Sequence, residues 1–130
     1  MNDFAELAAV VGAGAELPWI PVAPGVSSKS LAFFRDGKGW VSLLRLEAGA
    51  RIPPHRHRGE VHGFVLAGRR RLGLAGPVLG PAAYEHEPAG QVDTWMVEGE
   101  EPLISLFVVG GLVMYLDAEG KVVREETTES

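Results

Sequence analysis

The chain has 130 residues and no cysteine, so its length allows one domain with a single hydrophobic core, and neither a disulfide nor a thiolate metal site is available. Hydrophobic residues make up 46% of the sequence, with 17 glycines and 9 prolines, which indicates a globular domain with many turns. The formal net charge of -5 argues against general binding to nucleic acids or anionic lipids, because both reward clustered positive charge. Small molecules or proteins are therefore the expected partners.

The N-terminal segment predicts one short helix. Apolar residues recur at helical spacing from Phe4 to Val11 behind Asp3, a candidate N-cap, and the stretch GAG at 12–14 ends the pattern. The segment opens with an acidic residue and lacks the apolar core of a secretory signal. No run of the chain approaches the ~18 apolar residues needed to span a bilayer. We therefore expect a cytoplasmic protein that does not enter a membrane.

After this segment the chain alternates between short strand-like stretches and turn signals. The expected strands are rich in Val, Leu, Phe and Trp and cover residues 30–34, 40–46, 61–67, 71–74, 82–87, 93–98, 103–109 and 112–116. The sequences RDGKG at 35–39 and DAEG at 117–120 predict hairpin turns. Because no helical pattern separates the strands, the sequence predicts an antiparallel sandwich or barrel. We expect the chain to form a single domain over 1–130, with a core at about 22–118 and a polar tail that frays from about 124 onward.

Three of the four histidines lie in the stretch PPHRHRGEVHGF at 53–64. His55 and His57 are two residues apart, so on a strand their side chains leave the same face and converge on one point. Pro53 and Pro54 exclude a helix there. Two convergent imidazoles can begin a metal site, and in a chain without cysteine the other ligands must be nitrogen or oxygen. The alternative is a pair of solvated histidines at the end of a strand.

These residues belong to a longer pattern that resembles the two sequence motifs of the cupin family. The first motif, a glycine followed after five residues by His-x-His, matches GARIPPHRH at 49–57, and its closing glycine matches Gly68. The second motif is represented by Pro88, Gly90 and Asp93. The resemblance implies an all-β fold: a cupin (RmlC-like) antiparallel β-barrel or jelly roll, preceded here by the short N-terminal helix.

Three stretches, residues 40–68, 84–90 and 102–123, resemble more narrowly the 2,4'-dihydroxyacetophenone dioxygenase and acetylacetone dioxygenase group of cupins. Members of that group use a three-histidine iron(II) centre to cleave a carbon-carbon bond beside a carbonyl with dioxygen. The resemblance implies a metal-dependent dioxygenase that acts on a small ketone, such as an aryl hydroxyketone or a β-diketone. It implies a divalent metal, with iron(II) expected and zinc or nickel as alternatives.

The chain departs from this group at the third metal ligand. By position the first two ligands fall on His55 and His57, whereas the third, a histidine in the group, falls on Asp93. Two histidines and one carboxylate also form a known iron(II) arrangement, so Asp93 is a candidate ligand, and the alternative is a solvated carboxylate. The glutamate position of the wider family falls on Val61 or His62, depending on the spacing counted. His62 is thus a further candidate ligand, and the alternative is a strand histidine bonded to a neighbouring backbone group.

Further departures leave two classes of function open. Ala82 replaces the first glycine of the second motif, Val97 replaces its asparagine, and His86 stands where the group tends to have tyrosine. Because the third histidine is missing, a non-catalytic cupin that binds a metal or a small ligand as a sensor is the alternative to the dioxygenase. In either case the apolar stretch LISLFVVGGLVMYL at 103–116 predicts a homodimer.

Overall fold

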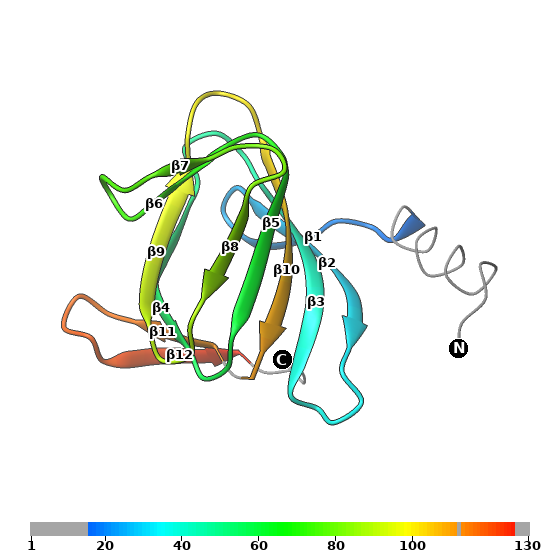
Figure 1. Cartoon of the computed structure of the whole chain (residues 1–130), viewed down its shortest axis with the longest axis vertical. Helices are drawn as coiled ribbons and strands as arrows, with labels where there is room; N and C mark the ends of the chain where they lie inside the picture. The colour runs from blue at the N-terminus through cyan, green and yellow to red at the C-terminus, as the bar shows by residue number, and fades with distance from the viewer. Residues whose placement is uncertain (1–15, 112, 127–130) are drawn as a thin grey trace.

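Two antiparallel sheets form the described part of the chain, residues 16–111 and 113–126, in the computed structural model (Figure 1). The first sheet contains, in spatial order, β1 (Ile20–Ala23), β2 (Val26–Phe33), β3 (Gly39–Leu46), β10 (Leu103–Gly110), β5 (Val61–Ala67) and β8 (Tyr84–Glu87). The second contains β12 (Val122–Glu126), β11 (Val113–Leu116), β4 (Arg51–His57), β9 (Val92–Val97), β6 (Arg70–Leu72) and β7 (Val78–Leu79). No helix within these ranges is long and apolar enough to cross a membrane.

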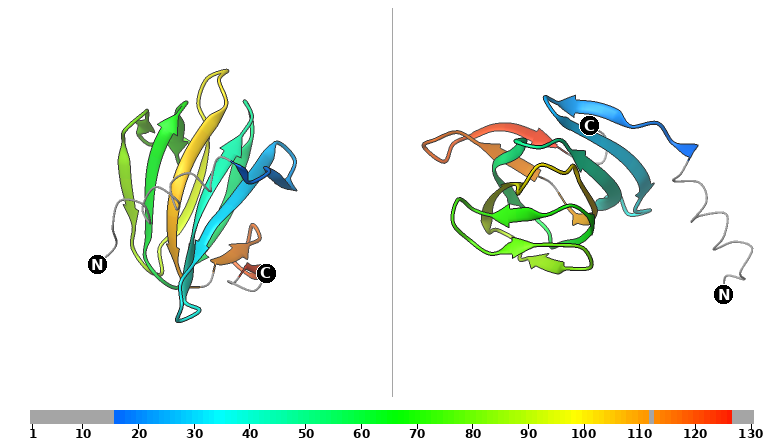
Figure 2. Two further views of the ribbon diagram at one scale, coloured as in Figure 1. Left: turned by 90° about the vertical axis from the view of Figure 1, so that its right-hand side faces the viewer. Right: turned by 90° about the horizontal axis from the view of Figure 1, so that it is seen from above.

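The two sheets face each other around one core, and they enclose it when the molecule is seen from above (Figure 2). β10 is paired on both sides, with β3 and β5, and its residues alternate between buried and half-buried. This period of two is the pattern that a strand shows when one face packs on a core. Trp95 on β9 stacks against Phe107 on β10 at 5.8 Å between ring centroids, so the sheets are in direct contact.

The predicted all-β architecture is confirmed for the described residues. β5 has the bounds predicted for it, and β3 and β10 each differ from their predicted stretches by one residue. These strands are long and carry alternating apolar residues, which is the signal that the prediction used. The predicted helix at Phe4 to Val11 lies outside the described residues.

Four strands lie where no strand was predicted: β1, β4, β7 and β12. β1, β7 and β12 each lie at an outer edge of a sheet, where one side of the strand faces solvent and the sequence shows little alternation of polar and apolar residues. β4 lies between β11 and β9, and its two prolines removed the signal of a strand. Residues 124–126 were assigned to the frayed tail. They belong to β12 instead, because they pair with β11 as far as the register Val113↔Glu126.

The prolines before the histidine pair lie within β4 and disturb its pairing. The register between β4 and β9 shifts between Ile52 and His55, and β11 pairs only with residues 55–57. A proline has no N–H to donate to a ladder, so the irregularity coincides with Pro53 and Pro54. The regular pairing of β4 resumes at His55 and fixes both histidines in register.

Two turn positions of the cupin motifs have left-handed backbone. Gly68 has a φ of 78°, and a Cβ there would collide with the backbone carbonyl of Pro102, so only glycine fits. Ala82 has a φ of 71° and is the only non-glycine residue of the described ranges with a positive φ. Ala82, at the position of the first glycine of the second motif, therefore holds a left-handed backbone at the cost of strain.

Candidate metal centre

The structure brings His55 and His57 together inside the barrel. Both lie on the inner face of β4 and are buried, with 3% and 6% of their surface exposed. Their ring centroids are 4.8 Å apart and the rings are nearly perpendicular, at 86°. The alternative of two solvated histidines therefore does not apply.

A third side chain at this point, Glu87, comes from the opposite sheet. It is the last residue of β8 and is 3% exposed. Its Oε1 lies 3.6 Å from Nε2 of His55 and 3.9 Å from Nε2 of His57. One nitrogen of each histidine and one oxygen of Glu87 all lie within 4.8 Å of one another, so the three residues can surround one ion.

Asp93 lies beside this triad, on β9. It is paired directly opposite His55 in the ladder between β4 and β9, so the two side chains share a face. Its Oδ1 accepts a hydrogen bond from Nε2 of Gln91 at 2.9 Å. Its Oδ2 is buried and has no hydrogen-bond partner among the described residues. The role of Asp93 as a metal ligand remains a prediction, and its position beside the triad is compatible with that role.

His62 is not brought to the triad. On β5 its neighbours Val61 and Gly63 are buried in the barrel, so the alternation of the strand directs His62 to the outer face of the sheet. There it belongs to a separate group with Glu60 and His86. His62 therefore does not belong to the same candidate metal site as His55 and His57, and any metal that it binds lies on the outer surface.

The inner cluster has the donor atoms that a divalent metal requires. Nδ1 of His55 lies 2.9 Å from the carbonyl oxygen of Pro53, so it donates a proton there and leaves Nε2 as the electron-pair donor. Nδ1 of His57 and Oε1 of Glu87 are buried without a hydrogen-bond partner among the described residues, as is Oδ2 of Asp93. Buried polar atoms are normally paired, so unpaired buried atoms on these neighbouring residues fit a site that binds a metal ion. Two imidazoles with carboxylate oxygens suit iron(II), zinc or nickel.

A cavity of about 280 Å³ adjoins the cluster. His55, His57 and Glu87 form part of its wall. Most of the remaining wall is apolar and includes the aromatic side chains Trp40, Phe107 and Tyr115. The cavity also contains polar groups, among them Ser28, Ser30, Ser42, Arg51 and Arg124. Apolar walls with a few polar groups are typical of a site for a small organic molecule.

Residues 8–112 match the family described as the ChrR cupin-like domain, which covers most of the chain. The chain belongs to this cupin family. The predicted membership in the cupin superfamily is thus confirmed. No curated protein matches the sequence.

Solved cupin structures share the fold. An RmlC-like cupin protein from Ralstonia eutropha JMP134 has 26% identity and a TM-score of 0.80 over 88% of this chain and 76% of its own. ChrR, solved in complex with SigE from Rhodobacter sphaeroides, has 26% identity and a TM-score of 0.66 over 79% of this chain and 54% of its own, so this cupin spans about half of that chain. An acetylacetone dioxygenase from Acinetobacter johnsonii has 18% identity and a TM-score of 0.73 over 84% of this chain and 78% of its own, which shows likeness of fold.

The environment of the cupin site makes its two histidines differ. Burial, and then the positive charge of His55, lower the pKa of His57 to about 4, so His57 is neutral at pH 7 as a metal ligand must be. Burial also acts to lower the pKa of His55, but the contacts with Glu87 and Pro53 and the nearby carboxylate charges outweigh it and raise the pKa above 6.5. A metal ion must therefore displace a proton that the site would otherwise hold between His55 and Glu87.

The two carboxyl groups of the cupin site also differ. Burial raises the pKa of Glu87 to about 7, against the opposing effect of His55. Burial acts to raise the pKa of Asp93 too, but its contacts with Glu87 and Gln91 and the two imidazole charges outweigh it and lower the pKa. Metal-free protein therefore carries its negative charge at Asp93 more readily than at Glu87.

Sequence reasoning did not identify Glu87 as a site residue. Its position depends on the pairing of β8 with β5, in which Val61 lies opposite Glu87 and His62 opposite His86. The available signal is the alternation in YEHE at 84–87: where Tyr84 and His86 face outward, Glu87 faces inward. An acidic residue at an inward position beside the second cupin motif is a ligand candidate, because an unpaired buried carboxylate is costly.

Proposed function

We propose that this cupin is a dioxygenase, dependent on a non-haem divalent iron, that cleaves a carbon-carbon bond in a small ketone. The observation that supports the proposal is the set of two imidazoles and a buried carboxylate in the wall of an apolar cavity. Two histidines and one carboxylate on one side of an iron(II) ion leave positions for a substrate and for dioxygen. The resemblance to the acetylacetone dioxygenase group suggests aryl hydroxyketones and β-diketones as substrates.

In this proposal each group of the site has a distinct task. His55, His57 and Glu87 hold the metal, and Asp93 is the further oxygen ligand that its buried Oδ2 allows. A bound iron(II) ion would supply Lewis acidity towards the oxygens of the ketone and electrons for the reduction of dioxygen. The carbonyl of Pro53 fixes the tautomer of His55.

The cavity walls would bind and orient the substrate. Trp40, Phe107 and the other apolar side chains keep water from the reacting carbonyl group. Hydroxyl groups of Ser28, Ser30 and Ser42 line the same cavity and are suited to donate hydrogen bonds to substrate oxygens.

Oxygen consumption tests this proposal. Metal-free protein is reconstituted anaerobically with iron(II), and oxygen uptake is recorded with a panel of aryl hydroxyketones and β-diketones. We expect uptake with at least one of them in the parent protein and none in His57→Ala, which removes one of two imidazole ligands. Glu119→Gln, a change in the exposed turn between β11 and β12, is the control and should match the parent. Flat traces with iron-loaded parent protein and the whole panel would reject a dioxygenase of this type.

A second candidate function is non-catalytic binding of a metal or small ligand, as in a sensor. The match to the ChrR cupin-like family favours it, together with the 26% identity to ChrR, which was solved bound to SigE. The absence of the third histidine at position 93 favours it as well. Flat oxygen traces together with a ligand-dependent rise in the thermal midpoint would support this function over the first.

The homodimer is proposed on the outer face of the first sheet. Within the stretch 103–116, alternate residues such as Phe107 and Val109 face the core, whereas Ile104, Leu106 and Val108 are half-buried on the outer side. Light scattering of the eluting peak in size-exclusion chromatography gives the mass. A mass of one chain at all concentrations would reject the homodimer.

A further inference from the structure

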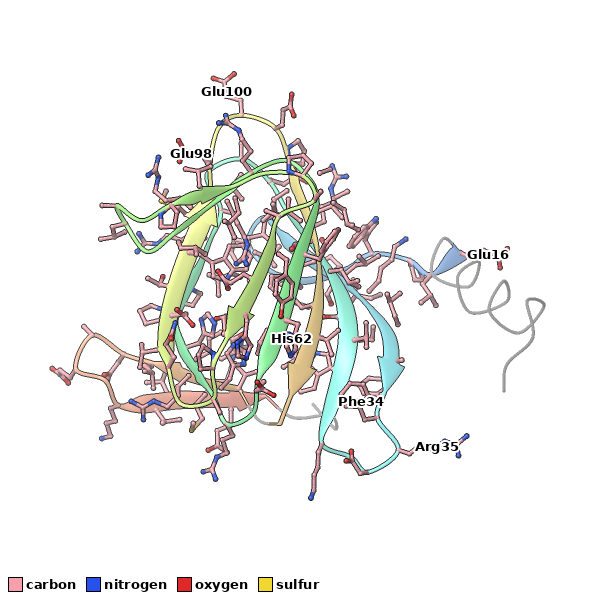
Figure 3. The ribbon with its side chains drawn as sticks, viewed as in Figure 1. Glu16, Phe34, Arg35, His62, Glu98 and Glu100 are labelled. Carbon is pink, nitrogen blue, oxygen red and sulfur yellow. The ribbon has the colours of Figure 1, made fainter. Side chains whose placement is uncertain are left out.

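Glu60, His62 and His86 form a cluster on the outer surface, separate from the barrel interior. His62 on β5 is labelled in Figure 3, and it is paired directly opposite His86 on β8. Their rings are stacked at 5.0 Å between centroids, with 15° between the ring planes. Oε1 of Glu60 lies 2.7 Å from Nε2 of His86. One nitrogen from each imidazole and one carboxylate oxygen lie within 4.8 Å of one another.

We propose that Glu60, His62 and His86 form a second metal site that binds Zn²⁺ and the similar cations Ni²⁺ and Cu²⁺ at the surface. Two imidazoles and one carboxylate are a ligand set that these cations prefer over Mg²⁺ or Ca²⁺, which favour oxygen alone. Three protein ligands leave a fourth position for water in a tetrahedral site. The proposal goes beyond the dioxygenase function and does not depend on it.

The backbone around the cluster is fixed, which favours binding. His62 and His86 lie on hydrogen-bonded strands, so their Cα positions are set by the sheet. Glu60 precedes β5, and its carbonyl oxygen accepts a hydrogen bond from N–H of Gly110 at 2.8 Å. A site held by paired strands loses less conformational entropy on binding than one on a loose loop.

The contacts of His62 resemble those of a metal-ligating histidine. Nδ1 of His62 lies 2.6 Å from the hydroxyl oxygen of Tyr84, and the two rings stack at 5.9 Å between centroids. A ligating imidazole usually has its second nitrogen bonded to another group, which orients the ring. Tyr84 therefore orients His62 and leaves its other nitrogen available.

To bind one ion, the two imidazole rings must turn out of their stacked arrangement, because the lone pair of a ring nitrogen lies in the ring plane and the two planes are only 15° apart. Zinc bonds to nitrogen and oxygen are about 2.0–2.1 Å long, so two ligand atoms of one tetrahedral zinc lie about 3.3 Å apart. The ligand atoms here lie within 4.8 Å of one another. His86 and Glu60 have 40% and 63% of their side-chain surface exposed, so rotation of these side chains can close the difference without disturbing the core.

The two clusters divide the histidines of the chain between them, two in each, and β8 supplies one member to each. Glu87 faces the interior and His86 faces outward. Single substitutions can therefore remove one cluster and leave the other intact.

The number of zinc ions bound tests the proposal. Tag-free, metal-free protein is dialysed to equilibrium against Zn²⁺, and bound metal is measured by elemental analysis. We expect two zinc ions per chain for the parent, one for His86→Gln, one for His57→Ala and none for the double variant. If His86→Gln binds as much zinc as the parent, the surface site is rejected. If His86→Gln binds none while the parent binds one, the surface site stands and the buried metal centre fails.

Two further measurements keep the proposal testable if His57→Ala does not fold. Glu60→Gln should weaken the surface site by at least about tenfold in calorimetric titration, whereas Glu119→Gln, another exposed glutamate, should leave it unchanged. Paramagnetic Cu²⁺ should broaden the imidazole proton signals of His62 and His86 in the parent protein at substoichiometric amounts. Equal titrations for both glutamate variants, or no broadening at the two rings, would overturn the site.

Discussion

Glu87 combines a metal-binding role with a cost to stability. Burial raises its pKa to about 7 from the usual 4.5, so the folded state holds this proton more tightly than the unfolded state. The contribution of Glu87 to stability is therefore greatest at low pH and falls as the pH rises from about 4.5 to 7. In metal-free protein we expect Glu87→Gln to raise the free energy of unfolding at pH 8 by roughly 1–3 kcal/mol. At pH 4.5 the gain should be much smaller, and the same variant should lose bound metal.

Urea unfolding in the presence of a chelator measures the stability change at the two pH values. The difference between variant and parent reports Glu87 together with its effects on His55 and Asp93, because the pKa values of both depend on Glu87. Glu119→Gln, at an exposed turn, is the matched control. A Glu87→Gln variant that is less stable than the parent at pH 8, yet still binds metal, would contradict the assignment.

Substitutions at position 93 test whether Asp93 is a further ligand beside His55, His57 and Glu87. If Asp93 is a ligand, Asp93→Ala should lose most of the iron, whereas Asp93→His should keep it with a third imidazole and match or exceed the parent in ketone-dependent oxygen uptake. His62→Ala should keep the buried iron, because His62 faces the outer surface. The iron content of the three variants, prepared side by side, shows whether Asp93 is a metal ligand. Equal iron in Asp93→Ala and the parent would show that the other ligands suffice.

Ala82 is strained, and its removal should stabilise the protein. Its φ of 71° is unfavourable for any residue with a Cβ, at a cost of about 1–2 kcal/mol. The turn is nevertheless fixed, because N–H of Ala82 donates to the carbonyl of Val65 at 2.9 Å. We expect Ala82→Gly to raise the free energy of unfolding by roughly 1 kcal/mol in urea titrations, since part of the gain is offset by the flexibility of glycine when unfolded. Ala83→Gly, at a residue without positive φ, should instead destabilise the protein.

At the level of the strands, an ion pair joins the two sheets. Arg70 on β6 is fully buried, and its Nη2 lies 3.2 Å from Oε1 of Glu85 on β8. Its guanidinium also stacks over Trp95 and Phe107, at 4.7 and 5.2 Å from the ring centroids. Removing one member of a buried pair leaves the other charge uncompensated. Arg70→Met should therefore lower the free energy of unfolding by roughly 3–5 kcal/mol.

A second substitution separates the lost charge pair from the lost packing around Arg70. In Arg70→Met, adding Glu85→Gln should recover part of the stability, because no buried carboxylate is then left unpaired. Urea unfolding of the single and double variants measures the recovery. A double variant that is as unstable as Arg70→Met would assign the loss to packing against the aromatic rings instead.

Strands with a clear alternation of apolar residues were predictable from sequence, whereas three of the edge strands, the proline-containing β4 and the contacts between sheets were not. β10 alternates apolar residues because one of its faces packs on the core, so its bounds could be predicted. β1 is exposed along its length and has no such alternation. His55 and His57 were predictable as a pair because two residues on one strand share a face. Glu87 was not, because it reaches them from the other sheet, and no local pattern encodes which strands face each other.

At the scale of the whole molecule, the metal centre draws ligands from both sheets. β4 of the second sheet supplies the two histidines, and β8 of the first supplies Glu87. An ion that binds only when the two sheets are in place stabilises the folded state by mass action, by about 2.7 kcal/mol when free metal is 100-fold above its Kd. For a domain of this size, such a gain raises the thermal midpoint by roughly 10 °C.

The thermal midpoint should therefore rise with zinc or nickel in the parent, and Mg²⁺ at the same concentration should have little effect because it disfavours imidazole. His57→Ala should lose the part of the rise that the buried ion supplies, and His86→Gln the part that the surface ion supplies, because each ion binds only the folded chain. The part lost in His57→Ala should be the larger, since the buried centre draws its ligands from both sheets. Differential scanning calorimetry of the parent and both variants measures the shifts. A rise that persists in His57→Ala and disappears in His86→Gln would place the stabilising ion at the surface and contradict a buried centre that ties the sheets together.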